Sequence, residues 1–204
     1  MYNSLLSYGD LIPLNIKCNV EKLIFQTKGF EYLKYNPRKD IQRYGLSITS
    51  LKGELDGIDL DSLKEYNKEN NTNYDELSFK KFTAVYRANM EIQRIVKPFK
   101  EYVGRSHLLM LPKGGYFPPH RDLPVYIEQQ NSLRILVPLK GCNPPDMYFM
   151  YEDKPLYFEH GRAYFLNTNK SHSLFSMNGS LMVVLNIEAN EEVYKIIGNH
   201  FQTT

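Results

Sequence analysis

From residue 106 onward, short apolar runs alternate with residues that favour turns. The runs cover residues 107–111, 133–139, 147–151, 156–158, 163–166, 173–177 and 181–187. The breakers between them include Lys113-Gly114-Gly115, His160-Gly161 and Asn178-Gly179, the last a strong hairpin signal. Seven short strands at this spacing predict a β-sandwich or jelly roll.

The first 104 residues show a different pattern, mixed and mostly helical. Asn19 and Asp61 are expected to cap short helices over residues 21–25 and 62–68, with a strand over residues 44–50 between them. Apolar periodicity over residues 84–96 predicts an amphipathic helix that Pro98 stops. We therefore expect an α+β protein of one domain, residues 1–204. It comprises an N-terminal region (1–104), a mainly β jelly-roll core (105–190) and a C-terminal helix (191–204).

Composition narrows the classes of function. The 204 residues include 25 basic and 23 acidic side chains, so the net charge of +2 does not indicate a nucleic-acid-binding protein. The two cysteines, Cys18 and Cys142, are too few for a zinc ribbon or a disulfide framework, and we expect free thiols. No export signal or membrane-spanning apolar run is evident, which predicts a soluble, cytoplasmic protein without a membrane partner.

The candidate chemistry begins in the run Gly114-Gly115-Tyr116-Phe117-Pro118-Pro119-His120-Arg121-Asp122. His120 and Asp122 are two residues apart, and on a strand such residues share a face. His172 lies much later, again at the edge of an apolar run. Two histidines and one carboxylate with open positions form the facial triad that holds non-haem Fe(II), so His120, Asp122 and His172 are candidate catalytic metal ligands.

Other interpretations of these residues are available. Each histidine alone is better explained as a hydrogen-bonding residue, and Asp122 as a loop cap, whereas the three in this order favour a metal. The remaining candidates, His107 and His160, are expected to be structural. His120-Arg121-Asp122-Leu123 also resembles the start of a kinase catalytic loop, but Ile127 stands where a kinase has asparagine. A kinase is therefore excluded.

Three segments together carry a family resemblance: residues 114–122, residues 133–139, and residues 161–165 leading to His172. They resemble the 2-oxoglutarate- and Fe(II)-dependent oxygenases, most closely the aspartyl/asparaginyl β-hydroxylase-like branch and small oxygenases of phage genomes. The resemblance covers roughly residues 105–195. It implies a double-stranded β-helix, a cupin-like jelly roll, with His120, Asp122 and His172 as the iron ligands.

The resemblance also implies a basic residue that binds the distal carboxylate of 2-oxoglutarate, and Arg134 matches it. A guanidinium forms a planar, bidentate clamp for a carboxylate. Many family members carry a second arginine after the distal histidine, where this chain has Ser180-Leu181-Met182-Val183. The anchoring role therefore falls on Arg134, with Arg162, Lys170 or Arg105 as substitutes.

The resemblance implies a dioxygenase that uses Fe(II), 2-oxoglutarate and O2 and releases succinate and carbon dioxide while hydroxylating a C–H bond. A protein side chain or free amino acid is the favoured substrate by analogy, and a nucleobase stays possible. Residues 121–130 and 143–145 are expected to select it, with residues 123–130 as a lid. Two alternatives are open: a cupin-like metalloenzyme that does not use 2-oxoglutarate, and a non-catalytic jelly-roll binding module.

Overall fold

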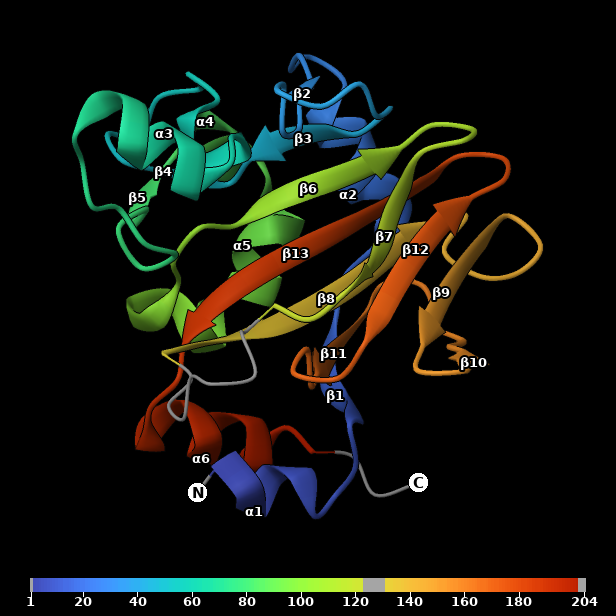
Figure 1. The fold of residues 1–204 in the computed structure, drawn as a ribbon. Helices are drawn as coiled ribbons and strands as arrows, with labels where there is room; N and C mark the ends of the chain where they lie inside the picture. Colours follow the sequence, from blue (N-terminus) through green and yellow to red (C-terminus); the bar gives the residue numbers. More distant parts are fainter. Residues whose placement is uncertain (1, 123–130, 202–204) are drawn as a thin grey trace.

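The computed structural model describes residues 2–122 and 131–201, and two antiparallel β-sheets face each other in it (Figure 1). The larger sheet has the order β1-β11-β8-β13-β6-β3-β2. Its strands are β1 (Leu11–Lys17), β11 (Arg162–Leu166), β8 (Ser132–Lys140), β13 (Ser180–Glu188), β6 (His107–Leu111), β3 (Tyr44–Ser47) and β2 (Leu33–Lys34). The smaller sheet joins β10 (Lys154–Pro155), β9 (Met147–Tyr151), β12 (His172–Ser176) and β7 (Tyr116–His120) in that order.

Successive strands of the β-rich half alternate between the two sheets. The chain passes from β6 to β7, β8 and β9, and then from β11 to β12 and β13, changing sheet at each step. This alternation produces a double-stranded β-helix, as expected from the sequence. The space between the sheets is filled by every second residue of a strand, such as Leu109 and Leu111 of β6, whereas Leu108 faces the opposite side.

The turn at Asn178-Gly179 is not a hairpin, so this part of the prediction was wrong. β12 pairs with β7 and β9, whereas β13 pairs with β6 and β8, and the turn carries the chain from one sheet to the other. Gly179 has a φ of 100°, a backbone conformation that glycine adopts far more readily than other residues. Residues 156–158 also form no strand. The strand that pairs with β9 at this point, β10, ends just before them at Pro155.

Helices cover the outer face of the larger sheet (Figure 1). They are α1 (Tyr2–Leu6), α2 (Val20–Thr27), α4 (Ala84–Ala88), α5 (Met90–Val96) and α6 (Glu191–Asn199), with the 3-10 segment η2 (Lys97–Tyr102). Buried residues of α2, α5 and α6 pack with the outward side chains of β8 and β13 into one core. A second core lies between the two sheets and forms the floor of the site described below.

The N-terminal half also contains η1 (Ile58–Leu60), α3 (Leu63–Asn70) and the two-stranded pair of β4 (Thr49–Ser50) and β5 (Lys81–Phe82). Asn19 caps α2 as expected, since its side chain accepts a hydrogen bond from the Lys22 amide. Asp61 does not cap α3: Ser62 occupies that position, and Asp61 pairs with Arg38.

The single helix expected over residues 84–96 is two helices. Asn89 has extended backbone and accepts hydrogen bonds from the Glu91 and Ile92 amides, so it ends α4 and caps α5. Within the described parts of the chain, no helix has the length and apolar character needed to cross a bilayer.

Candidate metal centre

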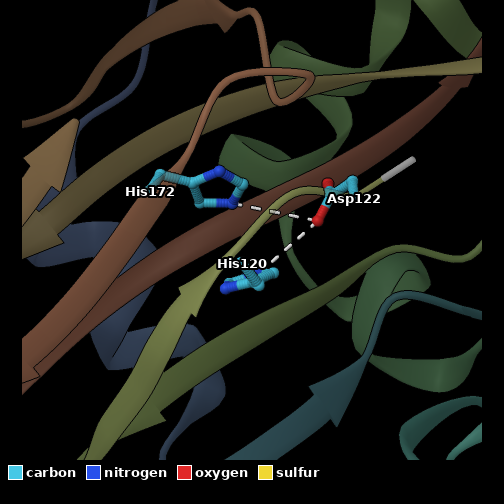
Figure 2. Close-up of side chains that lie close together, drawn as sticks. All are labelled: His120, Asp122 and His172. Atoms are coloured by element: carbon cyan, nitrogen blue, oxygen red, sulfur yellow. Dashed lines mark ion pairs between the residues drawn. The ribbon is translucent and has the colours of Figure 1, made fainter. Parts of the chain in front are cut away.

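His120, Asp122 and His172 meet at one end of the space between the sheets. His120 ends β7, His172 begins β12, and the two residues are direct cross-strand partners. Oδ1 of Asp122 lies 3.6 Å from Nε2 of His120 and 3.8 Å from Nε2 of His172. Figure 2 shows both imidazoles directed at this one carboxylate oxygen. One donor atom from each residue lies within 4.8 Å of the others, close enough to hold one ion.

Backbone carbonyls fix the orientation of both imidazole rings. Nδ1 of His120 lies 2.8 Å from the carbonyl oxygen of Pro118, and Nδ1 of His172 lies 3.0 Å from that of Lys170. Because a carbonyl only accepts, each Nδ1 carries the proton and donates, which leaves Nε2 of a neutral ring with a lone pair. A hydrogen bond from Nδ1 to a backbone carbonyl is typical of histidines that ligate metals through Nε2.

The charge state of the triad suits a cation. Burial lowers the pKa of His172, which favours the neutral ring. Burial opposes ionisation of Asp122, but the neighbouring Arg134 guanidinium favours the charged form, and the pKa of this carboxyl group is lowered. When both rings are neutral, their Nε2 lone pairs face a carboxylate oxygen. Three such electron-rich donors fit a divalent metal ion, which would relieve their mutual repulsion.

The triad lines a cavity whose walls come from both halves of the chain. Leucine, methionine, valine and phenylalanine side chains cover much of it, and polar groups gather near the triad. The lining comprises Tyr35, Glu76, Arg105, His107, Leu109, Phe117, His120, Asp122, Arg134, Leu136, Phe149, Leu166, Thr168, His172, Leu174, Met182 and Val184. Polar and titratable groups that converge in a cavity with apolar walls are typical of a ligand-binding site.

The likeness to known proteins lies in structure and not in sequence. No family model matches the chain, and no curated protein sequence matches it. The collagen prolyl hydroxylase vCPH of Paramecium Bursaria Chlorella virus-1, in a 2OG complex, has a TM-score of 0.50 at 8% identity, over 92% of this chain and 99% of that one. The shared feature is the fold.

Two further structures have lower scores. A prolyl-4-hydroxylase from Pseudomonas putida has a TM-score of 0.48 at 10% identity, covering 92% of this chain and 97% of its own. A 2OG-Fe(II) oxygenase family protein from Burkholderia pseudomallei has a TM-score of 0.44 at 10% identity, covering 83% of this chain and 77% of its own.

The basic residues suggested by the sequence occupy different places. Arg134 lines the cavity on β8, and its Nε donates to Oδ2 of Asp122 at 3.0 Å. Arg105 also lines the cavity, but Nε, Nη1 and Nη2 donate to Asp59, Glu76 and Asp61 respectively. Lys170 does not line the cavity and pairs with Asp10 at 2.7 Å.

Arg162 does not reach the triad. It begins β11, whereas Leu166, which pairs with Arg134 and lines the cavity, ends that strand. Four residues of a strand span about 13 Å. At its own end of the sheet, Arg162 pairs with Glu159 at 2.8 Å.

His107, for which we expected a structural role, lines the cavity from β6. It is 5% exposed, and its Nδ1 has no hydrogen-bond partner among the described residues. Burial, with Arg105 and Arg134 nearby, lowers the pKa of His107 well below 6.5, so the ring is neutral. The strand pattern contained the signal, because His107 shares a face with Leu109 and Leu111.

Of the regions expected to select a substrate, residues 123–130 lie outside the described part of the chain. Asn143 accepts a hydrogen bond from the Phe158 amide and donates one to its carbonyl. The loop at residues 143–145 is therefore tied to the segment after β10, and none of its residues is part of the cavity lining.

Proposed function

We propose that this protein is a non-haem Fe(II)- and 2-oxoglutarate-dependent dioxygenase that hydroxylates a C–H bond of its substrate. The observation that carries the proposal is the convergence of three donor atoms, from His120, Asp122 and His172, on one point of a cavity wall. All three residues line the cavity, so an ion that they held would be accessible to ligands in the cavity.

The donor set favours iron over structural zinc. Imidazole and carboxylate ligands with open positions suit Fe(II), whereas structural zinc is usually enclosed by four ligands, often thiolates. Cys142 is buried and bonds to the carbonyl groups of Lys140 and Leu181, and neither described cysteine lines the cavity. When bound, Fe(II) with 2-oxoglutarate and O2 would supply the oxidising power for hydroxylation.

The charges around the cavity support a dianionic cosubstrate. Glu76, Asp122, Arg105 and Arg134 are the charged lining residues described, and their charges cancel. A divalent metal would add two positive charges, which a dianion such as 2-oxoglutarate would neutralise. A neutral loaded cavity avoids the cost of burying net charge.

Arg134 is the best placed residue to anchor that cosubstrate. Its Nε bonds to Asp122 and its Nη1 forms an ion pair with Glu76 at 3.8 Å, whereas Nη2 donates to no side chain among the described residues. The donors of Arg105 are all occupied. Arg134 would therefore orient the distal carboxylate while the apolar walls, including Leu136 and Phe149, exclude water from the reacting groups.

Two further points support the assignment. The viral collagen prolyl hydroxylase with the same fold is a 2OG complex, and the sequence segments around the triad resemble the same superfamily. By analogy with the aspartyl/asparaginyl β-hydroxylase-like branch, we propose a protein side chain or amino acid as the substrate.

The test is anaerobic binding of Fe(II) and 2-oxoglutarate, followed by measurement of succinate after oxygen is admitted. We expect the wild type to bind both and release succinate, His172→Ala to lose metal binding, and Arg134→Ala to bind 2-oxoglutarate at least about tenfold more weakly. Metal uptake without 2-oxoglutarate binding would instead indicate a cupin-like metalloenzyme. A wild type without metal uptake would indicate a binding module.

A further inference from the structure

A chain of polar contacts links the N-terminal half to the carboxylate of the triad. Glu76 lies in the segment between α3 and β5 and reaches into the cavity. Its Oε1 accepts a hydrogen bond from Nη1 of Arg105 at 3.0 Å, and its Oε2 accepts one from Nδ2 of Asn186. The same Oε2 lies 3.8 Å from Nη1 of Arg134.

The far side of this chain is firmly held. Arg105 is buried, and its other two donors bond to the backbone carbonyls of Asp59 and Asp61. The carbonyl of Glu76 also accepts the Arg105 amide at 2.8 Å. Gly104 permits this approach, since a Cβ there would lie 2.5 Å from the Glu76 carbonyl oxygen. The position of the Glu76 carboxylate is thus fixed by several contacts.

Arg134 consequently lies between two carboxylates. Its Nε bonds to Oδ2 of Asp122 at 3.0 Å, which leaves Oδ1 directed at the two imidazoles, and its Nη1 faces Glu76. Without the charge of Glu76, Asp122 would be the only carboxylate paired with Arg134 among the residues that the structure describes. The guanidinium would then compete more strongly with a metal for Asp122, and the cavity would gain one net positive charge.

We propose that Glu76 is a positioning residue for the metal centre: it holds Arg134 so that Asp122 presents one oxygen to the ion. The inference rests on the metal site proposed above and gives the N-terminal half a role in it. Partners that orient ligand groups in this way contribute strongly to metal affinity, and their removal typically weakens binding 10–100-fold.

The experiment measures the dissociation constant of Mn(II), a redox-inert probe here, by calorimetry under anaerobic conditions. We expect Glu76→Gln to weaken Mn(II) binding at least about tenfold. Binding of 2-oxoglutarate to the metal-saturated variant should not weaken, because the charge lost is negative. Glu188→Gln is the matched control, since Glu188 lies on β13 and pairs with Lys80 at the surface. It should bind Mn(II) like the wild type.

A second pair of variants tests whether Glu76 acts through Arg134. In an Arg134→Gln background, Glu76→Gln should have a much smaller effect on the Mn(II) dissociation constant. An equal effect in both backgrounds would show that Glu76 is merely a nearby charge and would overturn the proposal. If Glu76→Gln does not fold, judged by circular dichroism, Glu76→Asp replaces it. This variant keeps the charge but withdraws it from Arg134, and we expect severalfold weaker binding.

The outcomes separate this inference from the proposed function. Unchanged Mn(II) affinity in folded Glu76→Gln, with tight binding by the wild type, would overturn the inference alone. A wild type that binds no metal would overturn both.

Discussion

At the scale of single residues, hydrogen bonds decide which nitrogen of each imidazole is available to a metal ion. The Pro118 and Lys170 carbonyls each hold a proton on Nδ1, so in the neutral rings Nε2 is the nitrogen that presents a lone pair to Asp122. The sequence predicted these three residues because their types and order match a known ligand set. The strand pattern places His107 on one face with Leu109 and Leu111, but a histidine there is equally compatible with the core and with a cavity wall.

Replacement of Asp122 by asparagine tests the ligand set with little change in shape. The amide keeps an oxygen but loses the negative charge, so we expect Mn(II) affinity to fall at least about tenfold while the fold persists. Calorimetric titration measures the dissociation constant. Asp153→Asn, on the exposed turn between β9 and β10, is the control and should bind like the wild type. Equal affinities in the two variants would rule out Asp122 as a ligand.

The neutral, buried ring of His107 should make stability depend on pH. Its pKa in the folded state is well below the ordinary 6.5, so below that pH the unfolded chain binds a proton that the folded protein excludes. The free energy of unfolding therefore falls as the pH falls, by up to about 1.4 kcal/mol per pH unit.

His107→Gln removes this contribution. Between about pH 7.5 and pH 5.5, the metal-free variant should lose on the order of 1 kcal/mol less stability than the wild type. Urea unfolding at the two pH values provides the comparison. Identical losses in both proteins would mean that folding does not lower the pKa of His107.

At the scale of elements, local pattern located most strands but not their partners. Apolar runs placed β6 and β9 at their observed bounds, because both strands have buried residues between clear turn signals. The same pattern suggested a hairpin at Asn178-Gly179, since turn residues do not reveal whether the next strand pairs with the previous one or crosses to another sheet. The break in the helix over residues 84–96 was missed because apolar positions recur on both sides of Asn89, so the helical period appears continuous across it.

Two glycines, one in a turn between the sheets and one in a helix, differ in the space around them. Gly141, after β8, has a φ of 59°, and a Cβ there would lie 2.3 Å from the Gly179 carbonyl oxygen. Gly141→Ala should therefore destabilise the protein by roughly 1–3 kcal/mol. Gly198 in α6 has open space around it, so Gly198→Ala should stabilise it by up to about 1 kcal/mol. Thermal denaturation measures both changes, and a stabilising Gly141→Ala would contradict the observed turn.

At the scale of the whole molecule, the cavity depends on residues that sequence patterns cannot bring together. Tyr35 and Glu76 line it from the N-terminal half, although nothing in their local sequence indicates a site. Their position follows from long-range pairing, in which β3 adds to β6 at the edge of the larger sheet. The double-stranded β-helix was predictable from strand spacing and family resemblance, whereas the contribution of residues 1–104 to the cavity was not.

The same architecture predicts the order in which the molecule opens. β8 and β13 lie inside the larger sheet, with most side chains buried on both faces, whereas β2 and β10 are two-residue edge strands. Native-state hydrogen exchange should therefore find the slowest amides in β8 and β13 and fast exchange in β2 and β10. Slowest exchange in the smaller sheet would contradict this ordering of stability.

The direct pairing of His120 with His172 has a consequence for how the chain folds. If β12 slipped by one residue against β7, Ser173 would face His120, and the imidazole of His172 would turn to the outer side of the sheet. An ion that requires both imidazoles can bind only one alignment of these strands. Metal binding would thus stabilise only the chains in which β7 and β12 have the native register.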